Sequence, residues 1–278
     1  MTREHASPPT LTSTANPRFR AALSLRDRRE RARHGRLLVD GVREVARALD
    51  AGVALVEVFV APGASPEPAL DAVVARVAGL GVPIVSVTAD LLARLAYGER
   101  TSGIVAVASA PATSLEALRL PAEAPIVGIL EDVEKPGNLG AVCRSADAAG
   151  LDALIAAGTT AAPADPWNPN AVRASLGTVF TLPLAVASTG SVLAWLRDRG
   201  LRLVAARVDG SVPYTEADLG GPMALVLGSE ATGLTEAWSG ADVTAVRLPM
   251  RGRADSLNVA AAAAILFYEA RRQRDAGA

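Results

Sequence analysis

The chain has 278 residues, of which 50% are hydrophobic and only 4% aromatic, and its formal net charge is −1. This length allows one large domain or two ordinary ones, with a sizeable core that alanine, valine and leucine have to fill. The near-zero charge argues against a protein that is basic over its whole surface. Lys135 is the only lysine among the 28 lysines and arginines, which indicates compositional bias, so an arginine alone is weak evidence for function.

Cysteine and histidine are scarce. Cys143 is the single cysteine, and the two histidines, His5 and His34, lie near the amino end. These numbers exclude an internal disulfide, a cysteine-based metal cluster and a histidine cluster. No apolar run reaches membrane-spanning length, and the first ten residues lack a signal-peptide core. We therefore expect a soluble, cytoplasmic protein with no membrane partner, whose chemistry uses no metal.

The amino-terminal part alternates helix and strand patterns. Residues 1–15 are polar and rich in Ser, Thr and Pro, so we expect a disordered tail. The first domain, residues 16–110, is predicted to be a small α/β/α unit. Its helices are expected near 17–33, 42–52, 67–79 and 90–97, and its strands at 37–41, 54–61, 82–88 and 103–109.

The stretch 17–36 holds eight arginines against Asp27 and Glu30. Such a run is either the solvated face of a helix or a patch that faces phosphates, since a guanidinium fork matches phosphate oxygens. On the second interpretation, the candidate nucleic-acid contacts in this stretch are Arg18, Arg20, Arg28 and Arg36.

A linker is expected at residues 111–124, which contain proline and few large apolar side chains. Strand–helix alternation then resumes more strongly in a second domain, residues 125–278. We predict an α/β fold with a parallel sheet covered on both faces, in which ligands bind beyond the carboxyl ends of the strands. Strands are expected at 126–130, 153–156, 178–187, 201–208, 223–228 and 243–249, and helices near 139–149, 168–176, 190–199, 234–239 and 257–274.

The first predicted strand of this domain runs into PGNLGAVCRSADAAG, Pro136 to Gly150. Its glycines do not have the GxGxxG spacing of a dinucleotide site, and no Gly-Lys-Ser/Thr marks a P-loop. A tight turn before a helix explains the glycines, and Asn138 could be a helix cap. Arg144 is harder to explain, because it lies among small and apolar residues on a helix that we expect to be covered.

A second strand end is LVLGSEATGLT, in which Gly228 and Gly233 flank Glu230. Glycines around an acid allow the backbone to bend sharply and to approach a ligand closely, although Glu230 could also cap a helix.

A third polar loop leads into a helix that begins near Ser256 and contains five consecutive alanines. Ser256 would make a good N-cap. The first half of the helix, VAAAAAILF, has almost no polar face, so we expect it to be buried all round.

Together these stretches resemble the SpoU (TrmH) family of RNA ribose methyltransferases, within the SPOUT class. The family motifs are matched by EDVEKPGNLGAVCRSADAAG, LVLGSEATGL and LPMRGRADSLNVAAAAAI, and by ADPWNPNAVRASLGTVFTLPL between the first two. The resemblance covers residues 125–275. The first domain more loosely resembles the family's substrate-binding domain, and the architecture is nearest to the thiostrepton- and avilamycin-resistance ribosomal RNA methyltransferases.

The resemblance implies a deep trefoil knot, a homodimer, S-adenosyl-L-methionine as methyl donor and a structured RNA substrate, ribosomal RNA rather than transfer RNA. It places Arg144 at the ribose, either as the base or bound to the adjacent phosphate. The second role agrees better with a guanidinium, which stays protonated at neutral pH. Asn138, Glu230, Ser256 and Asn258 would complete the catalytic cluster, and Arg173 would contact RNA phosphate. The cofactor-binding residues implied, largely through their backbone, are Leu227, Gly228, Leu248, Met250, Ser256 and Leu257.

Three alternatives remain at this point. The chain could methylate transfer RNA, or it could be a knotted RNA-binding protein without activity, which the presence of Asn138, Arg144, Glu230 and Asn258 argues against. A nucleotide-dependent oxidoreductase is the third, and the missing GxGxxG pattern is adverse to it.

Overall fold

The computed structural model of the chain describes residues 10–61, 68–97, 102–159, 164–229 and 231–277. They form two compact units. Unit 1 consists of the chain up to Pro111 together with the segment Trp167–Phe180, and unit 2 consists of Ala112–Pro166 and Thr181–Ala278. Within the described ranges, no helix has the length and apolar character needed to cross a membrane.

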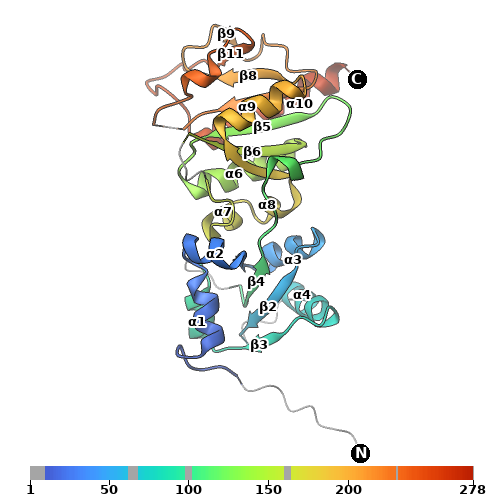
Figure 1. Cartoon of the computed structure of the whole chain (residues 1–278), viewed down its shortest axis with the longest axis vertical. Coiled ribbons are helices and arrows are strands. Elements are labelled where there is room, and N and C mark those ends of the chain that lie inside the picture. Colours follow the sequence, from blue (N-terminus) through green and yellow to red (C-terminus); the bar gives the residue numbers. More distant parts are fainter. Residues whose placement is uncertain (1–9, 62–67, 98–101, 160–163, 230, 278) are drawn as a thin grey trace, which may run out of the picture. The chain divides into compact units, whose positions relative to one another are not determined.

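Unit 1 is built on a mixed sheet with the strand order β1-β4-β2-β3 (Figure 1). β4 runs antiparallel to β1 and β2, and β2 runs parallel to β3. The residues of α1 and α5 share a buried core with alternate residues of the strands, including Phe59 and Val107. The strands are β1 (Arg36–Asp40), β2 (Leu55–Val60), β3 (Ile84–Ser86) and β4 (Ile104–Ser109), and the helices are α1 (Pro17–Ser24), α2 (Arg28–His34), α3 (Val42–Asp50), α4 (Pro68–Gly79) and α5 (Ala89–Leu95).

The helix predicted over 17–33 is two helices instead. The carboxylate of Asp27 accepts hydrogen bonds from the backbone N–H groups of Arg29, at 2.7 Å, and Glu30, at 3.3 Å. Asp27 therefore caps α2 and begins a new helix where the apolar pattern alone suggested a continuous one.

The segment Trp167–Phe180 belongs to unit 1 although the residues on either side of it belong to unit 2. It carries α7 (Pro169–Ala174), which packs against β1. Arg47 donates to the carbonyl oxygen of Leu176 at 2.7 Å, and the rings of Trp167 and Phe180 stack with their centroids 5.9 Å apart. The strand predicted over 178–187 is correct only in its second half, because α8 (Thr178–Thr181) forms a helical turn and β7 (Leu184–Ser188) follows it.

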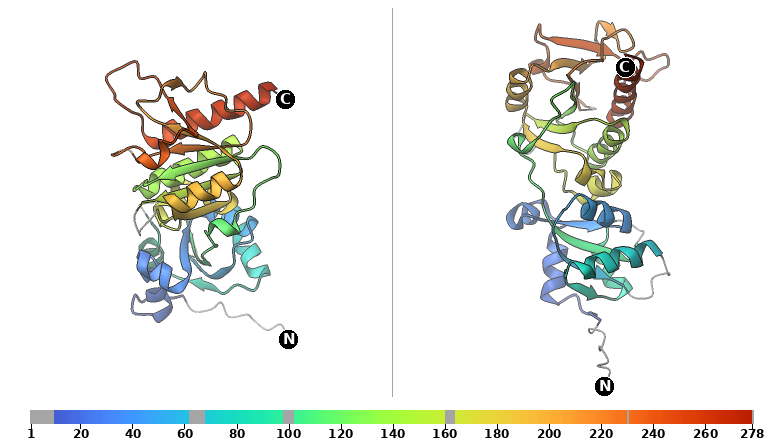
Figure 2. Two further views of the ribbon diagram at one scale, coloured as in Figure 1. Left: turned by 45° about the horizontal axis from the view of Figure 1, so that its top comes forward. Right: turned by 90° about the vertical axis from the view of Figure 1, so that its right-hand side faces the viewer.

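Unit 2 confirms the predicted parallel sheet. Its described strands have the order β7-β6-β5-β10-β8-β11-β9, and each pairs in parallel with its neighbours. α6 and α10 lie on one face, and α9 lies on the other (Figure 2). The further elements are η1 (Leu115–Ala117), β5 (Ile126–Glu131), α6 (Pro136–Ala149), β6 (Ala153–Gly158), α9 (Thr189–Asp198), β8 (Arg202–Ala206), β9 (Val212–Pro213), β10 (Met223–Leu227), η2 (Glu236–Trp238), β11 (Val243–Arg247) and α10 (Val259–Gly277).

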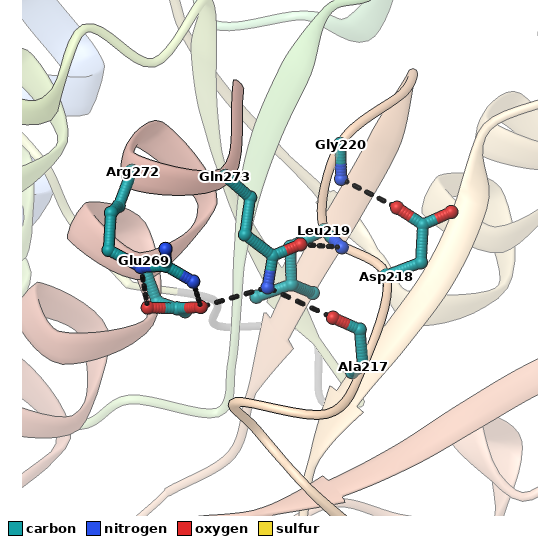
Figure 3. Close-up of polar contacts among 7 residues, drawn as sticks. All are labelled: Ala217, Asp218, Leu219, Gly220, Glu269, Arg272 and Gln273. Carbon is teal, nitrogen blue, oxygen red and sulfur yellow. Dashed lines mark hydrogen bonds and ion pairs between the residues drawn. The ribbon is translucent and has the colours of Figure 1, made fainter. Parts of the chain in front are cut away.

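Side chains from the last turns of α10 hold that helix to the loop before β10. The amide of Gln273 accepts a hydrogen bond from Leu219 N–H at 2.8 Å and donates to the carbonyl oxygen of Ala217 at 3.0 Å and to Glu269 at 2.8 Å (Figure 3). Arg271 donates to the carbonyl oxygens at the end of α6, those of Ala149 and Gly150. These bonds fix the carboxyl-terminal half of α10 against two other segments of unit 2.

The expectation that the first half of α10 is buried all round is wrong for the single chain. Val259, Ala263, Leu266 and Phe267 are buried, but Ala261 is exposed and Ile265 keeps 37% of its surface accessible. α6 and the sheet cover only one side of this helix, so the other side remains an apolar surface.

Candidate active site

The strand order places a topological switch between β5 and β10. After β5 the chain continues outward through β6 and β7, whereas β8, β9 and β11 lie on the opposite side of β10. β5 and β10 are nevertheless adjacent, with Leu130 paired to Leu227. In parallel sheets the crevice at such a point is the usual ligand site, and here it receives α6 from one strand and the loop after Leu227 from the other.

Two asparagines meet beyond this edge. Asn138 lies in the first turn of α6 and is half-buried. Asn258 immediately precedes α10, and its Nδ2 donates a hydrogen bond to Oδ1 of Asn138 at 3.3 Å. Two of the residues predicted for the catalytic cluster are therefore in contact.

Asn258 also caps α10, a role that the sequence assigned to Ser256. The Oδ1 atom of Asn258 accepts from Ala260 N–H at 3.0 Å, and its carbonyl oxygen accepts from Ala261 and Ala262. The helix starts two residues later than expected, and Ser256 lies in the exposed loop before it. Either residue type is a favourable N-cap, so residue type alone could not distinguish the two positions.

Arg144 is exposed on α6, two turns after its start. Within the described part of the chain, its guanidinium takes part in no hydrogen bond or ion pair, so it is available to a ligand. The adjacent Cys143 is fully buried, and burial raises the pKa of its thiol to about 12. Cys143 is therefore a packing residue of α6 and not a nucleophile at neutral pH.

The loop Gly228–Thr235 is a tight turn that depends on glycine. A Cβ atom at Gly228 would overlap the carbonyl carbon of Gly233 and the amide nitrogen of Leu234. Gly233 has a φ of 68° and donates to the carbonyl oxygen of Ser229 at 3.0 Å, and the Ser229 and Thr232 hydroxyls lie 2.9 Å apart. Glu230 lies outside the described residues.

Beneath this loop lies a buried carboxylate that the sequence analysis did not single out. Glu131, the last residue of β5, is completely buried. Its Oε1 accepts from the hydroxyls of Thr189, at 2.8 Å, and Thr235, at 3.0 Å, and its Oε2 accepts from Thr235 N–H at 2.8 Å. The available signal was an acid directly after the wholly apolar strand IVGIL.

The third predicted segment follows β11, which is separated from β10 by β8. Leu248 and Met250 are half-buried, and Leu257 exposes 37% of its surface. No hydrogen bond among the described residues joins the segment 248–257 to the Gly228–Thr235 loop, and the two share only the carboxyl edge of the sheet.

The arginines predicted to contact RNA differ in their surroundings in unit 1. Arg18 forms an ion pair with Glu57 at 2.9 Å, and Arg173 forms one with the buried Asp40 at 3.2 Å. The side chains of Arg20, Arg28 and Arg36 are exposed. Arg31, in the same stretch, is buried, and it donates to the carbonyl oxygens of Leu25 and Arg26. The arginine-rich stretch therefore includes at least one structural residue.

Two family models match the chain. Residues 125–268 match the SpoU rRNA Methylase family, and residues 16–106 match the MRM3-like substrate binding domain. A 23S rRNA (uridine(2479)-2′-O)-methyltransferase from Streptomyces viridochromogenes is 38% identical over 69% of this chain and 68% of its own length.

Solved structures of related proteins are similar to this chain over nearly its whole length. A crystal structure of an RNA 2′-O ribose methyltransferase shares 39% identity, covers 95% of this chain and 99% of the other, and has a TM-score of 0.83. The SpoU methyltransferase AviRb from Streptomyces viridochromogenes, in complex with the cofactor AdoMet, shares 32% identity over 95% of this chain and 100% of that one, with a TM-score of 0.82.

Proposed function

The chain belongs to the SpoU rRNA methylase family, and we propose that it transfers a methyl group from S-adenosylmethionine to a ribose 2′-hydroxyl of ribosomal RNA. The observation that carries this proposal is the pairing of Asn138 with Asn258 at the switch point of a parallel sheet, on the helix that also presents the available guanidinium of Arg144.

The loop residues fit S-adenosylmethionine. Gly228 has no side chain that could separate a ligand from the backbone, and the turn is held by its own hydrogen bonds. Such a backbone surface suits a cofactor that is bound by main-chain amides and carbonyls. The residues that would hold it are Leu227, Gly228, Leu248, Met250, Ser256 and Leu257.

S-adenosylmethionine supplies a methyl group that is already activated on a sulfonium, so the protein has to align the 2′-oxygen with it and give the hydroxyl proton a route. Arg144 would bind the phosphate next to the reacting ribose and orient the hydroxyl, because a guanidinium matches phosphate oxygens and keeps its own proton. Asn138 and Asn258 would position the ribose, with Glu230 and Ser256 completing the cluster.

Ribosomal RNA is favoured over transfer RNA because several relatives are named for 23S rRNA, among them one from Bacillus subtilis that covers 94% of this chain. A ribosomal substrate supports the proposal that the enzyme acts in the cytoplasm. Arg20, Arg28 and Arg36, exposed in the domain of the substrate-binding type, are the candidate contacts to RNA there, and Arg18 and Arg173 would contribute beside their ion pairs.

A homodimer would cover the apolar face of α10. Ala261, Ile265 and Tyr268 follow one another at spacings of four and three residues, and therefore lie on one side of the helix. Ile265 exposes 37% of its surface and Tyr268 exposes 53%. Large apolar side chains grouped in this way favour association with a second subunit. We also propose that unit 2 contains the trefoil knot that the family resemblance implies.

The experiment that tests the function uses methyl-labelled S-adenosylmethionine and separate pools of ribosomal and transfer RNA. We expect label in ribosomal RNA, at a position that resists alkaline cleavage because the 2′-hydroxyl is blocked. Label in transfer RNA alone would replace the proposed substrate, and label in neither pool would contradict the proposed activity.

A further inference from the structure

We propose that Glu131 is a positioning residue that fixes Thr235, where the chain leaves the loop after β10, and so orders the backbone near Gly228 for S-adenosylmethionine; this inference rests on the proposed function. Glu131 itself is completely buried beneath the loop and would not touch the cofactor. A carboxylate in the interior is costly unless its oxygens are hydrogen-bonded, so its presence needs a reason.

The hydrogen bonds of Glu131 supply that reason. Both of its oxygens are used for Thr235, since Oε2 accepts from the backbone N–H at 2.8 Å and Oε1 from the hydroxyl at 3.0 Å. Thr235 is the residue at which the chain leaves the loop. Hydrogen bonds to a charged acceptor are roughly twice as strong as neutral ones, so this end of the loop is held firmly.

The opposite end of the loop is fixed to the same strand. Leu227 pairs with Leu130 in the sheet, one residue before Glu131. The tip between the two ends is exposed at Ala231, Thr232 and Gly233, so packing contributes little to its order there. The backbone around Gly228 is therefore held in place by β5 at both ends, through the ladder at one and through Glu131 at the other.

Thr189 completes the arrangement from another element. It is the first residue of α9, and its hydroxyl donates to Oε1 of Glu131 at 2.8 Å. The partial positive charge at the start of a helix favours a carboxylate there. Thr189 stabilises the same buried group, and among the described residues no hydrogen bond joins Thr189 to the loop, which makes it the matched control.

The test compares Glu131→Ala, Glu131→Gln, Thr235→Val and Thr189→Val in the full-length protein. Calorimetry gives the affinity for S-adenosylmethionine, and hydrogen exchange reports the opening of residues 228–235. Glu131→Ala should weaken binding about tenfold or more, since charge-assisted hydrogen bonds that order the loop are lost. Exchange should increase in the loop more than in the strands.

Glu131→Gln should retain affinity within about threefold, because the amide oxygen can accept from Thr235 N–H while its NH₂ group donates to hydroxyls that reverse their roles. Thr235→Val keeps the backbone bond and should lie between the two, at a loss of about threefold. Thr189→Val should lower thermal stability but leave binding within about twofold.

Two results would overturn the inference. One is unchanged affinity and loop exchange in Glu131→Ala, and the other is an equal loss of affinity in Thr189→Val, which would indicate a general effect on folding. If Glu131→Ala does not fold, the affinities of the other two variants decide the question. The inference then requires that Thr235→Val binds S-adenosylmethionine more weakly than Thr189→Val does. Failure of the wild-type protein to bind S-adenosylmethionine would instead contradict the proposed function.

Discussion

Asn258 donates a hydrogen bond of 3.3 Å to Asn138, which lies 120 positions earlier in the sequence. This bond joins the starts of α6 and α10. α6 leaves the sheet after β5, and α10 packs along it on the same face. The amino-terminal end of each helix carries a partial positive charge, which favours a phosphate nearby. The contact therefore fixes two amide side chains in a place that suits the RNA backbone.

Asn258 caps α10 and has a proposed role in methyl transfer through its contact with Asn138, and substitutions can separate the two. Asn258→Ala removes the cap of α10 and should cost about 1 kcal/mol of unfolding free energy. Asn258→Ser restores an equally good cap but lacks the amide that reaches Asn138. We expect the serine variant to regain stability and to remain impaired in methyl transfer, as measured by denaturant unfolding and single-turnover kinetics. Full activity in Asn258→Ser would show that the contact with Asn138 has no catalytic importance.

Arg144→Ala should reduce methyl transfer on the order of a hundredfold or more, since misplacement of the reacting group alone can have that effect. Arg144→Lys keeps a positive charge but loses the planar fork, so its activity should lie between that of wild type and alanine.

The matched measurements for Arg144 are cofactor affinity and thermal stability. Both should stay near wild type, because the side chain is exposed and a surface substitution changes stability by about 0.5 kcal/mol or less. A large loss of cofactor affinity in Arg144→Ala would indicate that this residue binds the cofactor and not the ribose.

The sequence predicted the parallel sheet and nearly every strand of it, because apolar runs bounded by glycine and proline depend only on local pattern. It failed where a tertiary contact decided the outcome. Asp27 divides one predicted helix through a cap, and α10 is capped by Asn258, which also contacts Asn138, instead of by Ser256. The hydrogen bonds of Glu131 could not be predicted from the sequence, since its partners Thr189 and Thr235 are 58 and 104 residues away.

The apolar face of α10 provides a test of the homodimer. Ile265→Arg places a charge in the middle of this face and should weaken self-association about tenfold or more, since desolvated central residues dominate interfaces. Val208→Arg is the control, because Val208 is also an exposed apolar residue, with 76% of its surface accessible, and lies outside α10. Sedimentation velocity over a concentration series measures both. Equal behaviour of the two variants would contradict this interface.

Unit 1 should be stabilised by mild acid. Burial raises the pKa of Asp40 above its ordinary value, although the N–H of Tyr97 and the charge of Arg173 act in the opposite direction. Burial also raises the pKa of Glu44. Between the ordinary and the raised pKa the folded state binds more protons than the unfolded one, so the unfolding free energy falls as pH rises through this window and levels off above it.

Asp40→Asn should flatten this pH dependence, since an amide oxygen can still accept from Tyr97 N–H but does not titrate. Adding Glu44→Gln to the Asp40→Asn variant should remove the remaining pH dependence. Hydrogen exchange of the β4 amides reads the stability of unit 1 from about pH 4 to 7. If the unfolding free energy of Asp40→Asn changed with pH as steeply as that of the wild type, groups other than Asp40 would cause the pH dependence.

The single cysteine allows the opening of α6 to be measured without any substitution. Burial, chiefly, raises the pKa of Cys143 to about 12, so at pH 8 only about one thiol in ten thousand is ionised, against roughly a quarter for an ordinary thiol. Ellman's reagent should therefore label the native protein at least a thousandfold more slowly than the urea-unfolded chain, in proportion to ionisation alone. Because Cys143 precedes Arg144, the native labelling rate reports how often the helix that presents this arginine opens. Rapid labelling without denaturant would mean that α6 is not packed as the structure shows.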